Sequence, residues 1–236
     1  MYLTRFRVNT ARREARQLLG SPHRMHGAVN MSFPQSPSSD GTGPRLLWRV
    51  DHNSRAECFL FLVSPSRPDL THLVEQAGWP AADQPGWQTY EYGGFLSALS
   101  EGDTWAFRLT ANPVHNIRLK EGQPTKRTAH RTPRHQTQWL LSRQKEAGFE
   151  VVEKSVERRL LEHGDDHELI VRDHRDLQFG KATNDGARRQ NVSLIRATYD
   201  GRLRVTDATA LRRTLTHGLG KAKAYGCGLM TLAPVR

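Results

Sequence analysis

The chain has 236 residues, of which 36% are hydrophobic and 25% charged, as is typical of a globular protein with one large domain or two ordinary ones. We expect no membrane span, because no run approaches the roughly 18 to 20 apolar residues required. We also expect no secretory signal, because the N-terminus has no apolar segment. Cys58 and Cys227 are too few for a disulfide framework, which favours the reducing cytoplasm.

The formal net charge of +11 is unevenly spread along the chain. Residues 1–110 are nearly neutral, whereas residues 111–236 carry almost all of the excess. A strongly basic half favours a polyanionic partner, because each contact with a phosphate releases condensed counterions. A solvated basic surface without a partner is the alternative. An acidic membrane surface fits less well, since no basic amphipathic helix stands out.

The first half of the chain predicts the element order β-α-β-β-α-β. Apolar and polar residues alternate at 2–8, which predicts a strand. A short helix follows, and Ser21 with Pro22 then begins a second helix that runs to about residue 33. This order is typical of a ferredoxin-like domain. The other predicted elements are strands at 45–51, 57–64 and 87–95 and a helix at 69–78.

The second half repeats this order without recognisable internal sequence identity. Residues 149–162 and 167–180 predict a long hairpin around "HGDD". We therefore predict an α+β fold of two tandem ferredoxin-like (RRM-like) domains, residues 1–97 and 103–236. The other predicted elements are strands at 104–114, 190–205 and 227–235 and helices at 133–148 and 207–218.

The most distinctive local pattern is "HGLGKAKAYGCGL", residues 217–229. Glycines let a backbone approach a ligand closely and expose its N–H groups, and the interleaved Lys221 and Lys223 suit phosphates. The residue order of a nucleotide-binding P-loop is missing. A glycine-rich helix end that leads into a strand is the alternative. The glycines are Gly218, Gly220, Gly226 and Gly228.

A basic stretch at 118–134 is a second candidate site. Its glycine and prolines predict a loop. A flexible basic loop can follow a phosphate backbone, and arginine can also grip a guanine edge or stack on a base. An ordinary charged surface loop is the alternative. The basic residues are Arg118, Lys120, Lys126, Arg127, Arg131 and Arg134.

Two histidines, His23 and His26, are spaced to share one face of the predicted helix. A zinc site would need further ligands, and neither Cys58 nor Cys227 belongs to a CxxC motif. Magnesium chemistry would need clustered carboxylates, and none lies nearby in the sequence. Metal-free acid–base chemistry remains, for which imidazole is well suited. An exposed histidine pair without a function is the alternative.

Taken together, these segments resemble the CasE family, the CRISPR RNA endoribonuclease subunit of type I-E Cascade complexes. The resemblance includes "MYLTRF", "MHGAVNMSFP", "RLLWRVD", "FRLTANPV", "TKRT" and "WLLSRQKEAGF", and it is most specific in "GRLRVTDATALRRTLTHGLGKAKAYGCGLMTLAPV". It implies two ferredoxin-like domains, a CRISPR repeat stem-loop as substrate, and other Cascade subunits as partners. It also implies metal-independent cutting at the base of the stem, with no cofactor.

The resemblance further implies roles for individual residues. The family's histidine maps to His26, which would transfer the proton when a 2′-hydroxyl attacks the adjacent phosphate to leave a 2′,3′-cyclic phosphate. A family tyrosine maps to His23, which would orient the RNA or carry the second proton. A basic residue of some members maps near Met31. The expected RNA-binding residues are Arg24, Lys120, Lys126, Arg127, Arg131, Arg134, Gly218, Gly220, Lys221, Lys223 and Gly226.

Two other functions stay open. A non-catalytic RNA-binding scaffold would use the same fold without cutting, and the departures at His23 and Met31 leave room for it. A metal-dependent nuclease would lose its activity in EDTA, but the sequence has no carboxylate cluster beside the histidines to hold the ion.

Overall fold

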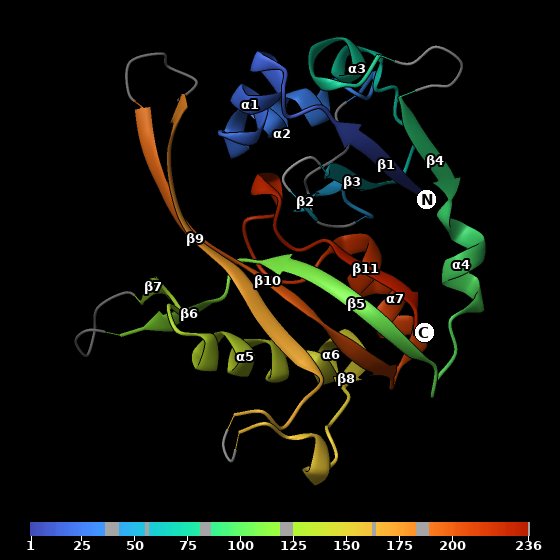
Figure 1. The fold of residues 1–236 in the computed structure, drawn as a ribbon, viewed down its shortest axis with the longest axis vertical. Helices are drawn as coiled ribbons and strands as arrows, with labels where there is room; N and C mark the ends of the chain where they lie inside the picture. The colour runs from blue at the N-terminus through green and yellow to red at the C-terminus, as the bar shows by residue number, and fades with distance from the viewer. Residues whose placement is uncertain are drawn as a thin grey trace.

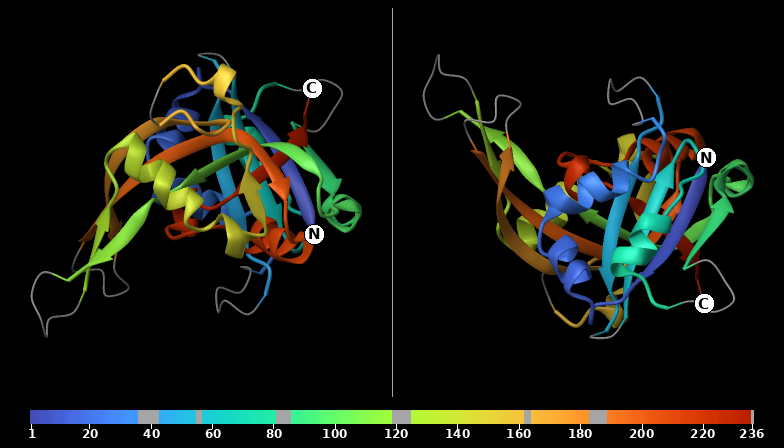
Figure 2. Two further views of the ribbon diagram at one scale, coloured as in Figure 1. Left: turned by 90° about the horizontal axis from the view of Figure 1, so that it is seen from below. Right: turned by 90° about the horizontal axis from the view of Figure 1, so that it is seen from above.

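A computed structural model describes residues 1–35, 43–54, 57–80, 86–118, 125–161, 164–182 and 189–235 (Figure 1). Two antiparallel sheets follow one another along the chain, and Figure 2 shows them from two further sides. No helix within these ranges is long and apolar enough to cross a membrane.

The first sheet has the strand order β2-β3-β1-β4, and all neighbouring strands are antiparallel. The first and third strands are central, as in a ferredoxin-like β-α-β-β-α-β unit. Three helices cover one face of this sheet. The strands are β1 (Tyr2–Val8), β2 (Leu47–His52), β3 (Cys58–Ser64) and β4 (Trp87–Glu91), and the helices are α1 (Arg13–Leu19), α2 (Pro22–Asn30) and α3 (Thr71–Ala77).

Local sequence determines where α2 begins and which side it buries. The side-chain oxygen of Ser21 accepts a hydrogen bond from the backbone N–H of Arg24, and Pro22 occupies the first turn. Met25 and Val29, one turn apart, are buried in the core under the first sheet. The helix therefore has a defined start and a defined inner face.

The second sheet has the equivalent order β11-β5-β10-β8, and β9 pairs with β10 as well. The predicted α+β, ferredoxin-like order is thus confirmed in both halves. The strands are β5 (Thr104–Ala111), β8 (Phe149–Val151), β9 (Leu169–Ala182), β10 (Arg189–Val205) and β11 (Met230–Pro234), and the helices are α5 (Pro133–Leu141), α6 (Gln144–Ala147) and α7 (Ala208–His217).

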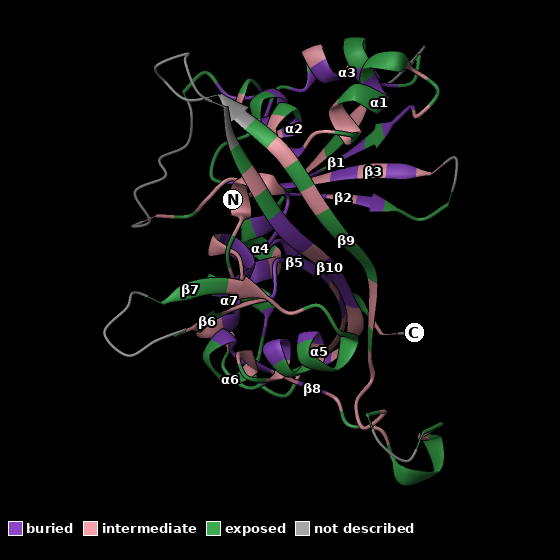
Figure 3. Ribbon diagram, turned by 90° about the vertical axis from the view of Figure 1, so that its left-hand side faces the viewer, coloured by how far each residue is buried: buried purple, intermediate pink, exposed green. Residues whose placement is uncertain are grey.

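The predicted long hairpin of 149–162 with 167–180 is confirmed only at its base, where Glu153 and His167 form an isolated antiparallel bridge. β8 and β9 lie end to end along one side of β10, because β8 pairs with residues 203–205 and β9 with residues 189–201. The segment between them leaves the sheet and contains the 3-10 helix η1 (Val156–Arg158). The long hairpin is β9–β10, whose arm rises toward α1 and α2 in Figure 1 and is largely exposed or half-buried near its end in Figure 3. Alternation of apolar residues does not reveal which strand a segment will pair with.

Three other predicted elements differ from the structure. The strand predicted at 87–95 ends at Glu91, and helix α4 (Tyr92–Ala98) follows, because Tyr92 and Leu96 are buried one helical turn apart. The basic stretch predicted as a loop contains β7 (Lys126–Ala129), which pairs with β6 (Val114–Ile117). The helix predicted at 133–148 is interrupted between α5 and α6.

A second buried cluster joins the two sheets. It includes Leu47 and Val63 of the first sheet together with Leu109, Tyr199 and Leu203 of the second. Burial of so much apolar surface between the halves makes their relative position part of the folded core. This packing decides which residues of the second half come to lie beside α2.

Arg49 ties the sheets together by hydrogen bonds as well. It is only 1% exposed, and its guanidinium donates to Asp51 at 2.7 and 2.9 Å. It also donates to the backbone oxygens of Arg108 at 2.7 Å and Leu229 at 3.1 Å. The buried charge is therefore paired and hydrogen-bonded across the junction, as a buried arginine requires.

Candidate active site and nucleic-acid interface

His23 and His26 lie on α2 outside its buried stripe, and both are half-buried. The amide nitrogen of Asn30 lies 3.3 Å from Nε2 of His26, one turn further along the helix. This contact restrains the orientation of the imidazole ring. Arg24 is exposed, and its guanidinium donates to the side-chain oxygen of Gln17 in α1 at 3.1 Å. The two predicted catalytic residues and one predicted RNA-binding residue thus belong to one short helix.

Two segments from the second half of the chain lie against α2. One is β9, and the other is the 3-10 helix η2 (Lys223–Tyr225). Because η2 belongs to the glycine-rich segment 217–229, the fold brings that segment next to the helix that carries the two histidines. Two of the three sites singled out in the sequence therefore form one surface.

The glycines of this segment are required for its packing. Gly226 has φ +76°, and a Cβ there would lie 2.6 Å from the ring of Trp48. Gly220 has φ +83°, and a Cβ there would lie 3.0 Å from the ring of Trp139. Gly218 ends α7 with φ +76°. The alternative interpretation, a glycine-rich helix end leading into a strand, therefore accounts for these glycines, and their contact with RNA stays a prediction.

Arg45, Lys221 and Lys223 form a group of cations around the glycine-rich segment. Lys223 is half-buried, and loss of contact with water, followed by the charges of Arg45 and Lys221, lowers its pKa from the ordinary 10.5. None of the three has a carboxylate oxygen of the described residues within 4.0 Å. Like charges held together without an acid favour a bound anion, which removes their repulsion.

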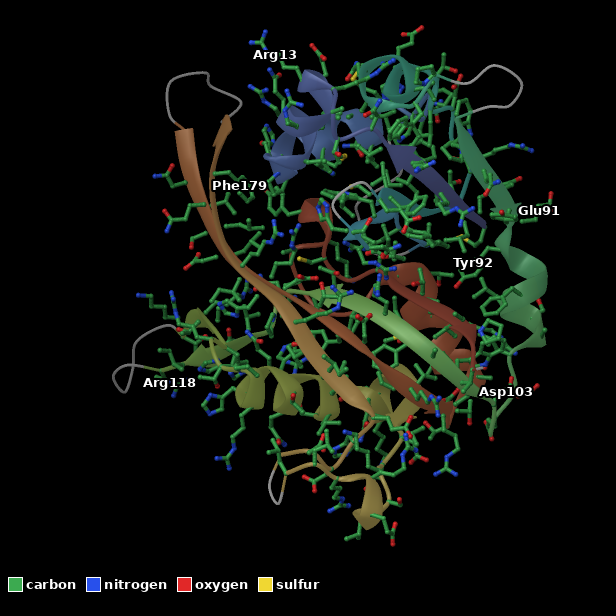
Figure 4. The ribbon with its side chains drawn as sticks, viewed as in Figure 1. Arg13, Glu91, Tyr92, Asp103, Arg118 and Phe179 are labelled. Atoms are coloured by element: carbon green, nitrogen blue, oxygen red, sulfur yellow. The ribbon has the colours of Figure 1, made fainter. Side chains whose placement is uncertain are left out.

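The basic stretch lies further from α2. Figure 4 shows Arg118 well away from Arg13 of α1. Oδ2 of Asp176 in β9 lies 3.6 Å from the guanidinium nitrogen Nη2 of Arg131. The stretch therefore adjoins the β9–β10 arm. Lys120 lies outside the described residues. The other predicted RNA-binding residues of this stretch are all exposed: Lys126, Arg127, Arg131 and Arg134.

A further cationic group was missed by the sequence reasoning. Arg175 of β9 and Arg196 of β10 are register partners, and they line a small pocket with His52 of β2. Burial, followed by the charges of these two arginines, lowers the pKa of His52. A like-charged pair directly opposite on adjacent strands is unfavourable, and Asp51 and Asp173, which line the same pocket, offset part of that repulsion. Only strand register could have revealed it, because the three residues are distant in the sequence.

The described residues contain no group of three or more His, Cys, Asp and Glu side chains placed to hold a metal ion. Cys58 and Cys227 are both buried and free. Burial raises the pKa of both thiols to about 12. At neutral pH both are therefore protonated, which makes them poor nucleophiles.

The fold and site define a class of protein: two ferredoxin-like units that present a cationic surface beside a histidine-bearing helix. The family described as CRISPR associated protein matches residues 1–234, so the chain belongs to this family. Over 234 residues it is 29% identical to the CRISPR-associated endoribonuclease Cse3 of Thermus thermophilus, covering 99% of this chain and 100% of that protein.

Solved structures agree with this assignment. The CRISPR endoribonuclease Cse3 bound to a 19-nucleotide RNA matches with a TM-score of 0.73 and 27% identity, over 99% of this chain and 100% of that chain. Thermus thermophilus Cse3 bound to an RNA representing a pre-cleavage complex matches with a TM-score of 0.71 and 26% identity, over 99% and 98%. The predicted membership of the CasE family and the predicted fold are confirmed.

Proposed function

We propose that this protein is an endoribonuclease that cuts CRISPR repeat transcripts at the base of their stem-loop to give mature crRNA, without a metal ion. The observation that carries the proposal is the packing of α2, with its two histidines, against the cationic η2 turn. The full-length similarity to Cse3, solved with RNA, supports RNA as the anion. Other subunits of a Cascade complex are the expected protein partners.

The chemistry is an internal transesterification. The ribose 2′-oxygen forms a bond to the adjacent phosphorus, the bond from phosphorus to the 5′-oxygen breaks, and a 2′,3′-cyclic phosphate and a 5′-hydroxyl result. One group must take the 2′-proton and another must supply a proton to the leaving oxygen. His26 is the principal proton-transfer residue, restrained by Asn30. His23, one turn earlier, orients the RNA or carries the second proton.

The developing negative charge on phosphorus needs cations nearby. The resemblance implies that a basic residue of some members maps near Met31, which is 70% exposed. The cations that lie against α2 come from the glycine-rich segment instead: Lys223, with Lys221 and Arg45 beside it. A half-buried ammonium group surrounded by other cations binds a phosphate more strongly than a solvated one, because less water screens it.

The RNA stem is bound mainly through its phosphates and its shape. An A-form stem hides its base edges in a deep, narrow groove, so side chains follow the backbone. The exposed cations of β7, of the start of α5 and of the residues between them suit this role. They are Lys126, Arg127, Arg131 and Arg134, with Lys120 expected to join them.

A denaturing gel of repeat RNA incubated with the protein in EDTA tests the proposal. We expect one cut, with a 2′,3′-cyclic phosphate on the upstream product, and no effect of added magnesium. Loss of cutting in EDTA would instead indicate a metal-dependent nuclease. Tight binding without any cut would favour a non-catalytic RNA-binding scaffold. The departures at His23 and Met31 from the family pattern make this the second candidate.

A further inference from the structure

A pocket of about 600 Å³ is lined by residues of the second half of the chain, and neither His23 nor His26 lines it. Its walls come from the β6–β7 hairpin, from α5 and α6, and from the beginning of the glycine-rich segment. This volume falls in the range of roughly 300 to 1,000 Å³ that small-ligand sites occupy. The side chains relevant to binding are His115, Asn116, Arg127, Trp139, Arg143 and Lys221.

Arg143 is held in the pocket wall without an ion pair to the described residues. Its guanidinium carbon lies 4.6 Å from the centre of the Trp139 ring, and it donates to the Trp139 carbonyl at 2.8 Å and to the hydroxyl of Ser142 at 3.0 Å. No carboxylate of the described residues lies within 4.0 Å of it. Glu146 also lines the pocket; it lies beyond that distance, but its charge acts on Arg143 and opposes the lowering of the Arg143 pKa by burial. Arg143 therefore retains a positive charge that a ligand can neutralise.

The opposite walls supply further binding groups. Asn116 and Arg127 are register partners in the β6–β7 hairpin, and Lys221 comes from the glycine-rich segment. Arg127 and Lys221 are exposed and have no carboxylate of the described residues within 4.0 Å. Gly220 lets the backbone lie directly on the Trp139 ring, so a larger residue would push the segment away from this wall.

We propose that this pocket binds one unpaired nucleotide of the RNA, with its base against the Arg143–Trp139 pair and its phosphate between Arg127 and Lys221. A guanidinium plane stacks well on a base, and an amide such as that of Asn116 can hydrogen-bond to a base edge. The pocket is too small for a double helix and large enough for a single nucleotide. The inference rests on the proposed function, since the ligand is part of the same RNA.

An acidic peptide of a partner protein is a less suitable ligand. The carboxylates of such a peptide would need only the cations of the pocket. The Arg143–Trp139 pair and the amide of Asn116 are suited instead to a flat ring that forms hydrogen bonds. The pocket also adjoins two predicted RNA-binding segments, β7 and the glycine-rich segment. A nucleotide next to the paired stem can reach it while the stem lies on the exposed cations.

The test is a scan of abasic sites through the unpaired nucleotides that flank the stem, with binding measured by filter retention at constant salt. One position is expected to lose about tenfold in affinity, the effect of one stacked base. The Arg143→Gln variant should bind the intact RNA about tenfold more weakly and no longer distinguish it from that abasic RNA. Lys221→Gln should weaken binding without removing the distinction.

Lys145→Gln is the matched control, because Lys145 is an exposed cation of α6 that does not line the pocket. Thermal melting checks that each variant is folded, and the abasic scan on the wild-type protein keeps the test available if Arg143→Gln is unstable. Equal affinity of all abasic RNAs for the folded wild-type protein would overturn the inference. If Arg143→Gln instead lost only its co-purification with Cascade subunits, the pocket would bind protein. Under either of these two outcomes, the proposed function would still hold as long as the wild-type protein binds and cuts intact RNA normally.

Discussion

Phe179 of the β9–β10 arm meets Tyr225 of η2 edge to face, with their ring centroids 4.8 Å apart. The arm is therefore attached to the same turn that carries Lys223 and lies against α2. We expect Phe179→Ala to slow RNA cutting about three- to tenfold, because an aromatic pair of this kind contributes about 0.5–1.5 kcal/mol. Single-turnover rates measure the effect. Phe179→Tyr keeps the ring and should cut normally; equal rates for Phe179→Ala and wild type would show that the contact does not position the turn.

His26→Ala should lower the cutting rate at least a hundredfold and leave RNA affinity nearly unchanged, because general acid–base catalysis contributes about 10²–10⁴. His23→Phe keeps a ring but cannot transfer a proton, so it should slow cutting about tenfold. If both histidines transfer protons, the wild-type cutting rate falls on both the acid and the alkaline side of a pH optimum. In His23→Phe the rate should then fall on only one side. An unchanged rate in His23→Phe would remove His23 from the mechanism.

RNA affinity should fall on the alkaline side at a pH below the ordinary lysine pKa of 10.5, because burial and neighbouring cations lower the pKa of Lys223. Lys223 by itself makes the free protein more stable over that range, since the unfolded chain binds the proton more tightly there. The buried thiols of Cys58 and Cys227 act in the opposite direction above their ordinary pKa of 9.0, so a melting curve at each pH separates weaker binding from unfolding. Lys223→Arg stays charged and should retain its affinity. Filter binding measured across pH compares the wild type with Lys223→Arg. Identical affinity curves for the two proteins would mean that Lys223 does not contact the RNA.

Neutralising Lys126, Arg127 and Arg131 together should weaken RNA binding and reduce the slope of log affinity against log salt by about 2 to 3, since each phosphate contact accounts for roughly 0.7 to 0.9. Binding titrations at several salt concentrations measure this slope. If the triple variant had the same salt slope as wild type, the RNA stem would bind to another surface of the protein. The matched control neutralises three exposed arginines outside this surface: Arg5, Arg67 and Arg204.

Asp200→Asn should destabilise the fold by about 1–3 kcal/mol at neutral pH, because it weakens charged hydrogen bonds. Oδ1 of Asp200 accepts from Arg108 at 2.6 Å and Oδ2 from Arg172 at 2.5 Å. Burial acts to raise the pKa of Asp200, but these two arginines outweigh it and hold the pKa below 3.8. The stabilisation is thus complete at neutral pH and disappears as the pH falls below about 3.8. Urea unfolding at several pH values measures it, with Glu101→Gln as the exposed control; a difference that persists in acid would contradict this account.

The start of α2 illustrates what local sequence can predict. Ser21, Pro22 and the buried spacing of Met25 and Val29 are encoded within nine residues, and the helix forms where expected. The β8–β9 error has the opposite origin. Both segments alternate correctly, yet the partner of each is β10, which lies far along the chain. Pairing depends on long-range contacts that no local pattern contains.

The cationic site shows the same division. The sequence singled out Lys221 and Lys223 because they lie among glycines, but Arg45 and Arg196 had no local signal. Their part in the site depends on the packing of one sheet against the other through Leu47 and its neighbours.

By itself, the sequence determined the order of the elements, the excess of positive charge in the second half and the histidine-bearing helix, because these depend on residue types and short spacings. Only the tertiary structure decided that η2 and β9 would lie against that helix and that β6–β7, α5 and Lys221 would enclose a pocket. The physical reason is that such contacts arise when buried apolar surfaces from distant segments pack together, and many different packings are compatible with the same local pattern.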